Sequence, residues 1–286
     1  MEGSPAVMQL RIVHRTEFGY DARASASYNQ ARMTPSSTPE QIVIHERLDV
    51  TPSPWTYPYT DYFGTHVIAF EIADPHEAMA VVATSTVQVH RAAPPAPSTP
   101  WDEYGERGIA DRWTEFLMLP DLVAPPEELA LRAREIAGSA ELPGQAAHAV
   151  VLLVHDEMRL LPESTDAATT AAQAWQQRTG AVQDMAHLAI GALRSIGIPA
   201  RYVAGYAHPV ADPAVGETVA GDSRAWVEWW DDGWRALDPS TATAPDDRYV
   251  SVGFGRDYED VPPLRGIYSG TDTSRMSVSV EMTRVG

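Results

Sequence analysis

The stretch RTGAVQDMAHLAIGALRSIGIPARYVAGY, residues 178–206, carries the clearest structural signal in the sequence. Apolar residues recur in it at helical intervals, and together they form one face made of Val182, Met185, Ala186, Ala189, Ile190 and Leu193. Gly197 suits the position just after a helix, and Pro199 prevents the helix from continuing. The pattern therefore predicts a helix over residues 182–196 and a strand over residues 200–206.

Further elements flank this helix on both sides. Residues 224–230 and 234–238 have the composition of strands, and Asp231-Asp232-Gly233 between them is typical of a hairpin turn. Before the helix, prolines and acidic residues in 124–129 mark a first helical turn, and the small residues of 165–174 predict a loop entering a short helix. Helices followed by an antiparallel sheet indicate an α+β fold.

The first third of the chain has the character of strands. Alternating or β-branched runs occupy residues 41–45, 66–70 and 80–89, with turn residues between them, so we expect a small antiparallel sandwich or barrel. Residues 91–100 contain four prolines and predict an extended connector. We therefore divide the chain into a β-rich domain (8–91), a proline-rich connector with a short helical segment (92–123) and a core domain (124–286).

Charge and missing residue types exclude several functions. The 286 residues include 21 Lys+Arg and 39 Asp+Glu, and the formal net charge of −18 repels phosphate backbones and anionic lipid surfaces. The chain has no Cys, hence no disulfide and no thiol nucleophile, and no Lys to form a Schiff base. No apolar run approaches the roughly 20 residues that span a bilayer. We expect a soluble, cytoplasmic protein with no nucleic-acid or membrane partner.

Longer motifs resemble one protein family. Residues 178–188 and 193–206 resemble the core of the bacterial transglutaminase-like proteins, where the pattern reads R-x-G-V-C-Q-D-F-A-H-L and then L-G-I-P-A-R-Y-V-S-G-Y. The resemblance extends to residues 222–228, 234–240 and 255–268, and to 28–35 and 61–64 in the β-rich part. It implies a β-rich N-terminal domain followed by a papain-like core, in which helices pack on an antiparallel sheet.

The resemblance also implies a Cys–His–Asp triad, and the chain departs from it. The family's Cys position is Val182 and its His position is Arg224, whereas Asp238 keeps the third member. Valine has no lone pair, and an arginine with a pKa above about 12 cannot act as a general base at neutral pH. We therefore interpret the chain as a transglutaminase-like pseudoenzyme.

Two arrangements of the former triad positions are open. In the first, Arg224 and Asp238 lie on adjacent strands and form a buried, charge-assisted pair in the old catalytic centre. In the second, Arg224 extends toward solvent and any pair is exposed and weak.

Substituted chemistry is the alternative interpretation, namely an amide or acyl hydrolase or transferase that does not use Cys. The candidate nucleophiles and bases are Ser223, Ser240, Thr179, His187 and His208. His187 lies five positions after Val182 and is turned from it by about 140° on a helix, which favours a structural role. Asp184 and His187 have the i, i+3 spacing of two metal ligands, but no third ligand accompanies them, so we predict no metal and no cofactor.

Aromatic residues near Arg224 favour a binding function. Trp226 and Trp230 share a strand face with Arg224, so we expect an aromatic wall along the former cleft, suited to a peptide or a carboxylate. The residues predicted to bind are Arg224, Trp226, Tyr206, Gln183 and Asp184. The favoured function is non-catalytic binding or scaffolding of a peptide or protein segment, and analogy with the family suggests a peptide-ligase-like enzyme as partner.

Overall fold

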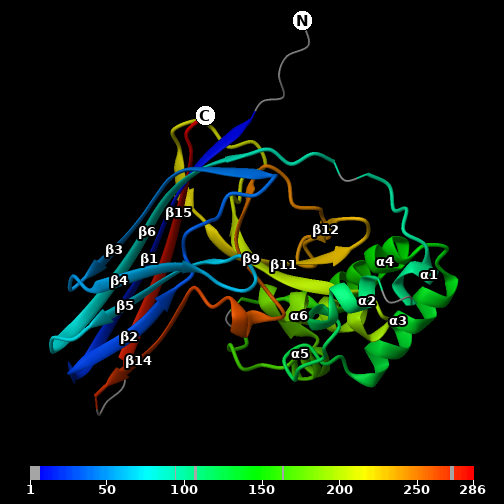
Figure 1. Ribbon diagram of the computed structural model, residues 1–286, viewed down its shortest axis with the longest axis horizontal. Helices are drawn as coiled ribbons and strands as arrows, with labels where there is room; N and C mark the ends of the chain where they lie inside the picture. The colour runs from blue at the N-terminus through cyan, green and yellow to red at the C-terminus, as the bar shows by residue number, and fades with distance from the viewer. Residues whose placement is uncertain (1–6, 94, 106–107, 163, 271–273) are drawn as a thin grey trace, which may run out of the picture.

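The computed structural model describes residues 7–93, 95–105, 108–162, 164–270 and 274–286; Pro94 of the predicted connector and residues 106–107 of the segment after it lie outside these ranges. In Figure 1, long strands lie on one side of the molecule and helices on the other, with β9 (Ala200–Ala207) and β11 (Asp222–Trp230) between them. The helices and antiparallel sheets confirm the predicted α+β class.

The β-rich part consists of two antiparallel sheets packed as a sandwich. Their strands are β1 (Met8–Ala24), β2 (Ala26–Ala31), β3 (Gln41–Thr51), β4 (Trp55–Thr60), β5 (His66–Ile72), β6 (His76–Val89), β10 (Thr218–Ala220), β14 (Leu264–Ser269) and β15 (Ser274–Arg284). The first sheet has the order β10-β15-β1-β6-β3 and the second β14-β2-β5-β4. Phe70 and Ile72 of one sheet share a buried cluster with Met79 and Val81 of the other, because alternate side chains of each strand face inward.

The C-terminal strands differ from the predicted domain boundary. We expected residues 124–286 to form the core, but β15 pairs with β1 from Leu10↔Arg284 to Tyr20↔Ser274, and β14 pairs with β2. The short β10, which precedes β11, also joins this sheet beside β15. Without β15, the long strand β1 would be paired only with β6, and the backbone groups along its other edge would lack hydrogen-bond partners.

The core consists of a four-stranded sheet covered by helices. The sheet has the order β12-β11-β9-β13, with β12 at Trp234–Leu237 and β13 at Tyr249–Gly255. The remaining elements are α1 (Trp101–Gly105), α2 (Ile109–Arg112), η1 (Thr114–Phe116), α3 (Glu127–Ser139), α4 (Pro143–Glu157), β7 (Arg159–Leu160), α5 (Ala171–Gln177), β8 (Thr179–Gly180), α6 (Val182–Ser195) and η2 (Tyr258–Asp260). Helix α6 is almost wholly buried and confirms the helix predicted from residue 182. Among the described residues, no helix combines the length and apolar character needed to cross a membrane.

The two parts share a packed junction. Tyr206 of β9 and Val250 of β13 belong to the same buried cluster as Leu10 of β1. Gln41, at the start of β3, donates to the Ser251 carbonyl at 2.7 Å and accepts from the Ser251 N–H at 2.9 Å. This junction brings the end of β2 close to the beginning of α6, where the candidate site lies.

Candidate functional site

The N-terminus of α6 is built by a short polar turn. Asp184 is fully buried, and its Oδ2 accepts hydrogen bonds from the Ala181 N–H at 2.7 Å and from Thr165 Oγ1 at 2.5 Å. A side chain at Gly180 would lie 2.8 Å from the Asp184 Cβ, so glycine is required before the turn. These contacts place Val182 as the first residue of the helix, on the wall of a pocket. Burial raises the pKa of Asp184.

The pocket has a volume of about 230 Å³ and lies between the core and the β-rich part. Val182 and Gln183 come from α6, Tyr202 and Tyr206 from β9, and Arg224 from β11. A further group of lining residues comes from outside these elements and includes Arg32, Tyr258 and Pro263. Two arginines and three tyrosines therefore surround the position that holds a nucleophile in the family pattern.

Arg224 is held by two side-chain contacts. Its Nη2 donates to Asp222 Oδ2 at 3.3 Å, and its Nη1 donates to Ser240 Oγ at 3.3 Å. Its Nε is buried and has no hydrogen-bond partner in the described chain. With 17% of its side chain exposed, Arg224 does not extend freely into solvent, so the second arrangement considered from the sequence is wrong on this point. Its ion pair is nevertheless an exposed one, as that arrangement expected, because Asp222 has 59% of its side chain exposed.

Asp238 is fully buried directly after β12, and its two oxygens are occupied by neighbours. Oδ1 accepts from the Ser240 N–H at 2.7 Å and from Ser240 Oγ at 2.6 Å, and Oδ2 accepts from the Tyr249 hydroxyl at 3.0 Å. Burial and the nearby Asp238 charge raise the pKa of Tyr249 to about 12, so this hydroxyl keeps its proton.

Arg224 and Asp238 are therefore linked through the Ser240 hydroxyl. This hydroxyl accepts from Arg224 and donates to Asp238, whereas Arg224 has its ion pair with Asp222. The direct pair of Arg224 and Asp238, the first of the two arrangements left open by the sequence, is not among the ion pairs of the described residues. Ser240 lies only two residues beyond Asp238, and its side chain turns back onto that carboxylate. Sequence reasoning missed this bridging role of Ser240.

The alternative nucleophiles and bases are dispersed. His187 is fully buried, and its Nε2 accepts from the Tyr258 N–H at 3.1 Å. His208 is buried as well, and its Nδ1 accepts from the Val210 N–H at 3.2 Å. Within the described chain neither histidine is hydrogen-bonded to Ser223, Ser240 or Thr179, so the structure assembles no hydroxyl–imidazole pair from them. The described residues also hold no cluster of three side chains suited to a metal ion.

The predicted binding residues are only partly brought together. Arg224, Tyr206 and Gln183 line the pocket, but Asp184 is buried beneath the α6 turn. Trp226 is also buried and packs edge-on against Tyr249, so it does not form the expected aromatic wall. Trp230 likewise lies away from the pocket, against Trp113 and Trp234. Tyrosines of β9 and η2 supply the pocket's aromatic surface instead.

Arg32 is the main residue that sequence reasoning missed. It follows β2, its side chain is 11% exposed, and its Nε lies 3.7 Å from Asp61 Oδ2. Its Nη2 donates to Gln30 Oε1 at 3.2 Å, but its Nε and Nη1 are buried without a hydrogen-bond partner in the described chain. The signal was present, because Arg32 belongs to the Tyr28–Pro35 stretch that resembles the family.

Comparisons with known proteins match both parts of the chain. A family model of the bacterial transglutaminase-like N-terminal region matches residues 10–88, and one of the transglutaminase-like superfamily matches residues 131–239. An uncharacterized protein of Mycobacterium leprae is 38% identical over 97% of this chain and 99% of its own length. The chain belongs to the transglutaminase-like superfamily. An uncharacterized protein of Mycobacterium tuberculosis is 31% identical to this transglutaminase-like chain over 95% of it and 91% of the relative.

The fold of this transglutaminase-like chain also matches a solved structure. A crystal structure of a candidate cysteine protease from Cytophaga hutchinsonii aligns with a TM-score of 0.76 at 20% identity. The alignment covers 99% of this chain and 92% of that protein. At this identity the likeness concerns the fold alone, and it includes the β-rich part as well as the papain-like core.

Acid should destabilise the protein through His187. Burial, with a smaller contribution from Arg194, lowers the pKa of His187 to about 3, and its ring also contacts Tyr202. The unfolded state, with a His pKa of about 6.5, binds the proton first, so stability present above pH 6.5 is lost as the pH falls toward 3. We expect about 3 kcal/mol of this loss by pH 4.

Urea denaturation of the protein and of His187→Gln between pH 7 and 4 measures this effect. The variant should start less stable and lose stability less steeply with acid, since only the original chain contains the titrating ring. Parallel pH profiles for the two proteins would show that His187 does not carry the dependence.

Proposed function

We propose that this transglutaminase-like protein is a non-catalytic binding protein whose pocket at Val182 holds a peptide or protein segment through a carboxylate group. The observation that carries the proposal is the position of Val182. It is the first residue of α6, on the wall of a formed pocket, where the family pattern has its nucleophile. A pocket that keeps its shape without a nucleophile is suited to holding a ligand.

The residues around the pocket support the proposal that the catalytic activity of the family's triad is lost. Valine provides no attacking atom, and Arg224 stays protonated and offers only donors. Loss of the nucleophile in a triad hydrolase lowers the rate by about a million-fold, and loss of the base adds little because the triad acts as a unit. The Ser240 hydroxyl is occupied by Asp238 and Arg224.

The same residues support carboxylate binding. Arg32 and Arg224 reach the pocket from different parts of the fold, and each keeps a buried N–H that has no hydrogen-bond partner among the described residues. A planar guanidinium matches a carboxylate in two parallel hydrogen bonds. Tyr202 and Tyr258 add apolar ring surface beside them, which suits the side chains or backbone of a peptide.

Titration calorimetry with N-acetyl-dialanine and its C-terminal amide tests the binding function. We expect the free carboxylate to bind at least about tenfold more tightly than the amide, because only the carboxylate pairs with both arginines. Arg224→Gln and Arg32→Gln should each remove this preference, whereas Arg15→Gln, an exposed arginine of β1, should keep it. Equal binding of acid and amide by the original protein would contradict the proposal.

Turnover assays on peptide amides, glutaminyl donors with an amine, and activated esters test the loss of catalysis. The original protein should show no turnover, and Val182→Cys with Arg224→His should restore some, because the double variant rebuilds a triad with Asp238. A thiol at residue 182 should be alkylated below pH 8 through the helix N-terminus. Ser139→Cys, at the exposed C-terminal end of α3, is the comparison thiol that has no helix N-terminus beside it. Turnover by the original protein would show that substituted chemistry operates.

A further inference from the structure

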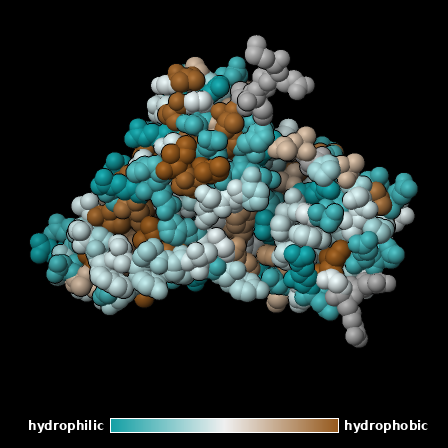
Figure 2. Space-filling view, turned by 45° about the horizontal axis from the view of Figure 1, so that its top comes forward, coloured by the Kyte–Doolittle hydropathy of each residue, from teal (hydrophilic) through white to brown (hydrophobic). Residues whose placement is uncertain are grey.

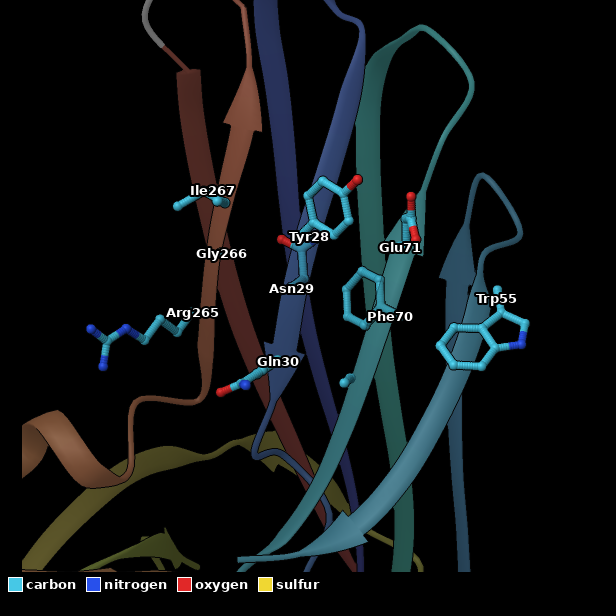
Figure 3. A pocket seen from close by; sticks show the side chains of 10 residues that line it. Tyr28, Asn29, Gln30, Trp55, Phe70, Glu71, Arg265, Gly266 and Ile267 are labelled. Carbon is cyan, nitrogen blue, oxygen red and sulfur yellow. The ribbon is translucent and has the colours of Figure 1, made fainter.

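A second candidate binding site lies on the outer face of the β14-β2-β5-β4 sheet, away from the Val182 pocket. Strand register places Ile267, Tyr28, Glu71 and Trp55 in one row across the four strands, and Figure 3 shows these side chains side by side. The next row contains Arg265, Gln30, Ala69 and Tyr57. We call the hollow between these rows, of about 480 Å³, the sheet groove.

The sides of the sheet groove are large apolar groups that no part of the described chain covers. Trp55 is 69% exposed, Tyr28 54% and Ile267 73%. Figure 2 shows hydrophobic patches at the surface on the β-rich side of the molecule. Isolated exposed apolar residues are common, but a cluster of rings around a hollow is typical of a ligand site.

The rings along β4 form a flat platform. The ring planes of Trp55 and Tyr57 are 8° apart with centroids 6.3 Å apart, and the Tyr59 ring follows Tyr57 at 6.1 Å with its plane inclined by 26°. Side chains two residues apart on a strand share a face, so the platform follows from the Trp-Thr-Tyr-Pro-Tyr sequence of β4. Such a row offers successive aromatic surfaces to a ligand made of repeated flat units.

The floor of the sheet groove is polar and charged. Ala69 leaves room at its centre, and Glu71 and Gln30 offer a carboxylate and an amide beside it. The Arg265 side chain extends outward from the edge strand β14 (Figure 3). Interaction with Glu71 raises the pKa of the nearby Tyr28 hydroxyl, and the carboxylate keeps further acceptor positions. The ligand must therefore combine an apolar face with both donors and acceptors along its edges.

We propose that the sheet groove binds a carbohydrate chain of β-linked hexopyranose units. Such a sugar ring has an apolar C–H face that stacks on an aromatic ring, and hydroxyl groups around its edge that donate and accept. Planar carboxylate and amide groups, such as those of Glu71 and Gln30, can each engage two adjacent hydroxyls. The site is independent of the function proposed for the Val182 pocket.

The groove chemistry disfavours other occupants. A proline-rich segment also docks on aromatic grooves, but its prolines have no N–H to donate to Glu71. Bases of nucleic acid also stack on aromatic rings, but a chain with a formal net charge of −18 repels their phosphates. A hexopyranose chain is uncharged and offers hydroxyl donors to Glu71.

Titration calorimetry with cellohexaose and with chitohexaose tests the proposal. We expect the original protein to bind at least one of them, and Trp55→Ala to weaken that binding about tenfold or more. Trp55→Phe keeps a ring and should keep most of the affinity, which separates stacking from any effect on folding. Tyr62→Ala removes an exposed aromatic residue outside the groove and should leave binding unchanged.

Three outcomes would overturn the proposal. They are no binding of either sugar, sugar binding that survives Trp55→Ala, and binding of decaproline in place of the sugars, which would assign the groove to peptides. The Arg224→Gln variant distinguishes the two sites, because it should lose the carboxylate preference of the Val182 pocket and bind sugar normally.

Discussion

Replacing Gly191 by alanine is expected to lower the free energy of unfolding by about 3 kcal/mol or more. Gly191 lies in the middle of α6, and a Cβ there would be 1.7 Å from the Val123 carbonyl oxygen and 2.9 Å from its carbon. These are backbone atoms, so relief requires the segment before α3 to move away from the helix. Urea denaturation measures the change.

The control for Gly191 is another helical glycine. Gly138 in α3 is exposed and has open space where a Cβ would be built. Alanine is favoured over glycine in a helix by about 1 kcal/mol, so Gly138→Ala should stabilise slightly. The two substitutions are chemically identical and should have opposite signs. A stabilising Gly191→Ala would mean that α6 and the Val123 backbone are not in close contact.

Replacing Asp238 by alanine should cost about 3 kcal/mol. The substitution leaves the Tyr249 hydroxyl, the Ser240 N–H and the Ser240 hydroxyl without their buried acceptor. It also removes the carboxylate to which the Ser240 hydroxyl links Arg224. Thermal and urea unfolding measure the loss. An unchanged stability would show that the carboxylate is not held as described.

Two variants isolate the part played by the buried carboxylate. Asp238→Asn keeps the shape and one acceptor oxygen, so it should lose less than Asp238→Ala. Asp222→Ala removes the other carboxylate near Arg224, but Asp222 has 59% of its side chain exposed, so the loss should be below about 1 kcal/mol. Equal losses for Asp222→Ala and Asp238→Ala would show that the exposed Arg224–Asp222 ion pair matters as much for stability as the buried Asp238 carboxylate.

The local elements of the core could be predicted because their signals are local. The apolar face from Val182, the Gly197 and Pro199 stop, and the Asp231-Asp232-Gly233 turn lie within their own helix or hairpin, and the structure has α6, β9, β11 and β12 there. Residues 274–284 also alternate apolar and polar residues, but their partner β1 lies at the other end of the chain. Strand pairing over such a distance has no signature in either segment alone.

The site was predictable in its positions and less so in its contacts. The family resemblance placed Val182, Arg224 and Asp238 in related positions, and Val182 and Arg224 do line one pocket. Strand alternation put Trp226 on the same face as Arg224, but what covers each part of that face depends on neighbouring segments. Trp226 is fully buried because Gly205 has no side chain and so leaves space for the indole ring. The bridging Ser240 depends on a turn whose direction the sequence alone does not specify.

The pairing of β1 with β15 has a consequence for the order of folding during synthesis. Strand β1 receives its second neighbour only from β15, which is synthesised after all the helices and strands of the core. The core elements from α3 to β13 have then already been synthesised, whereas one edge of β1 in the sandwich is still unpaired. A chain cut short after residue 263 lacks β14 and β15 and is therefore expected to expose β1 and aggregate, so only chains that include both strands should fold stably.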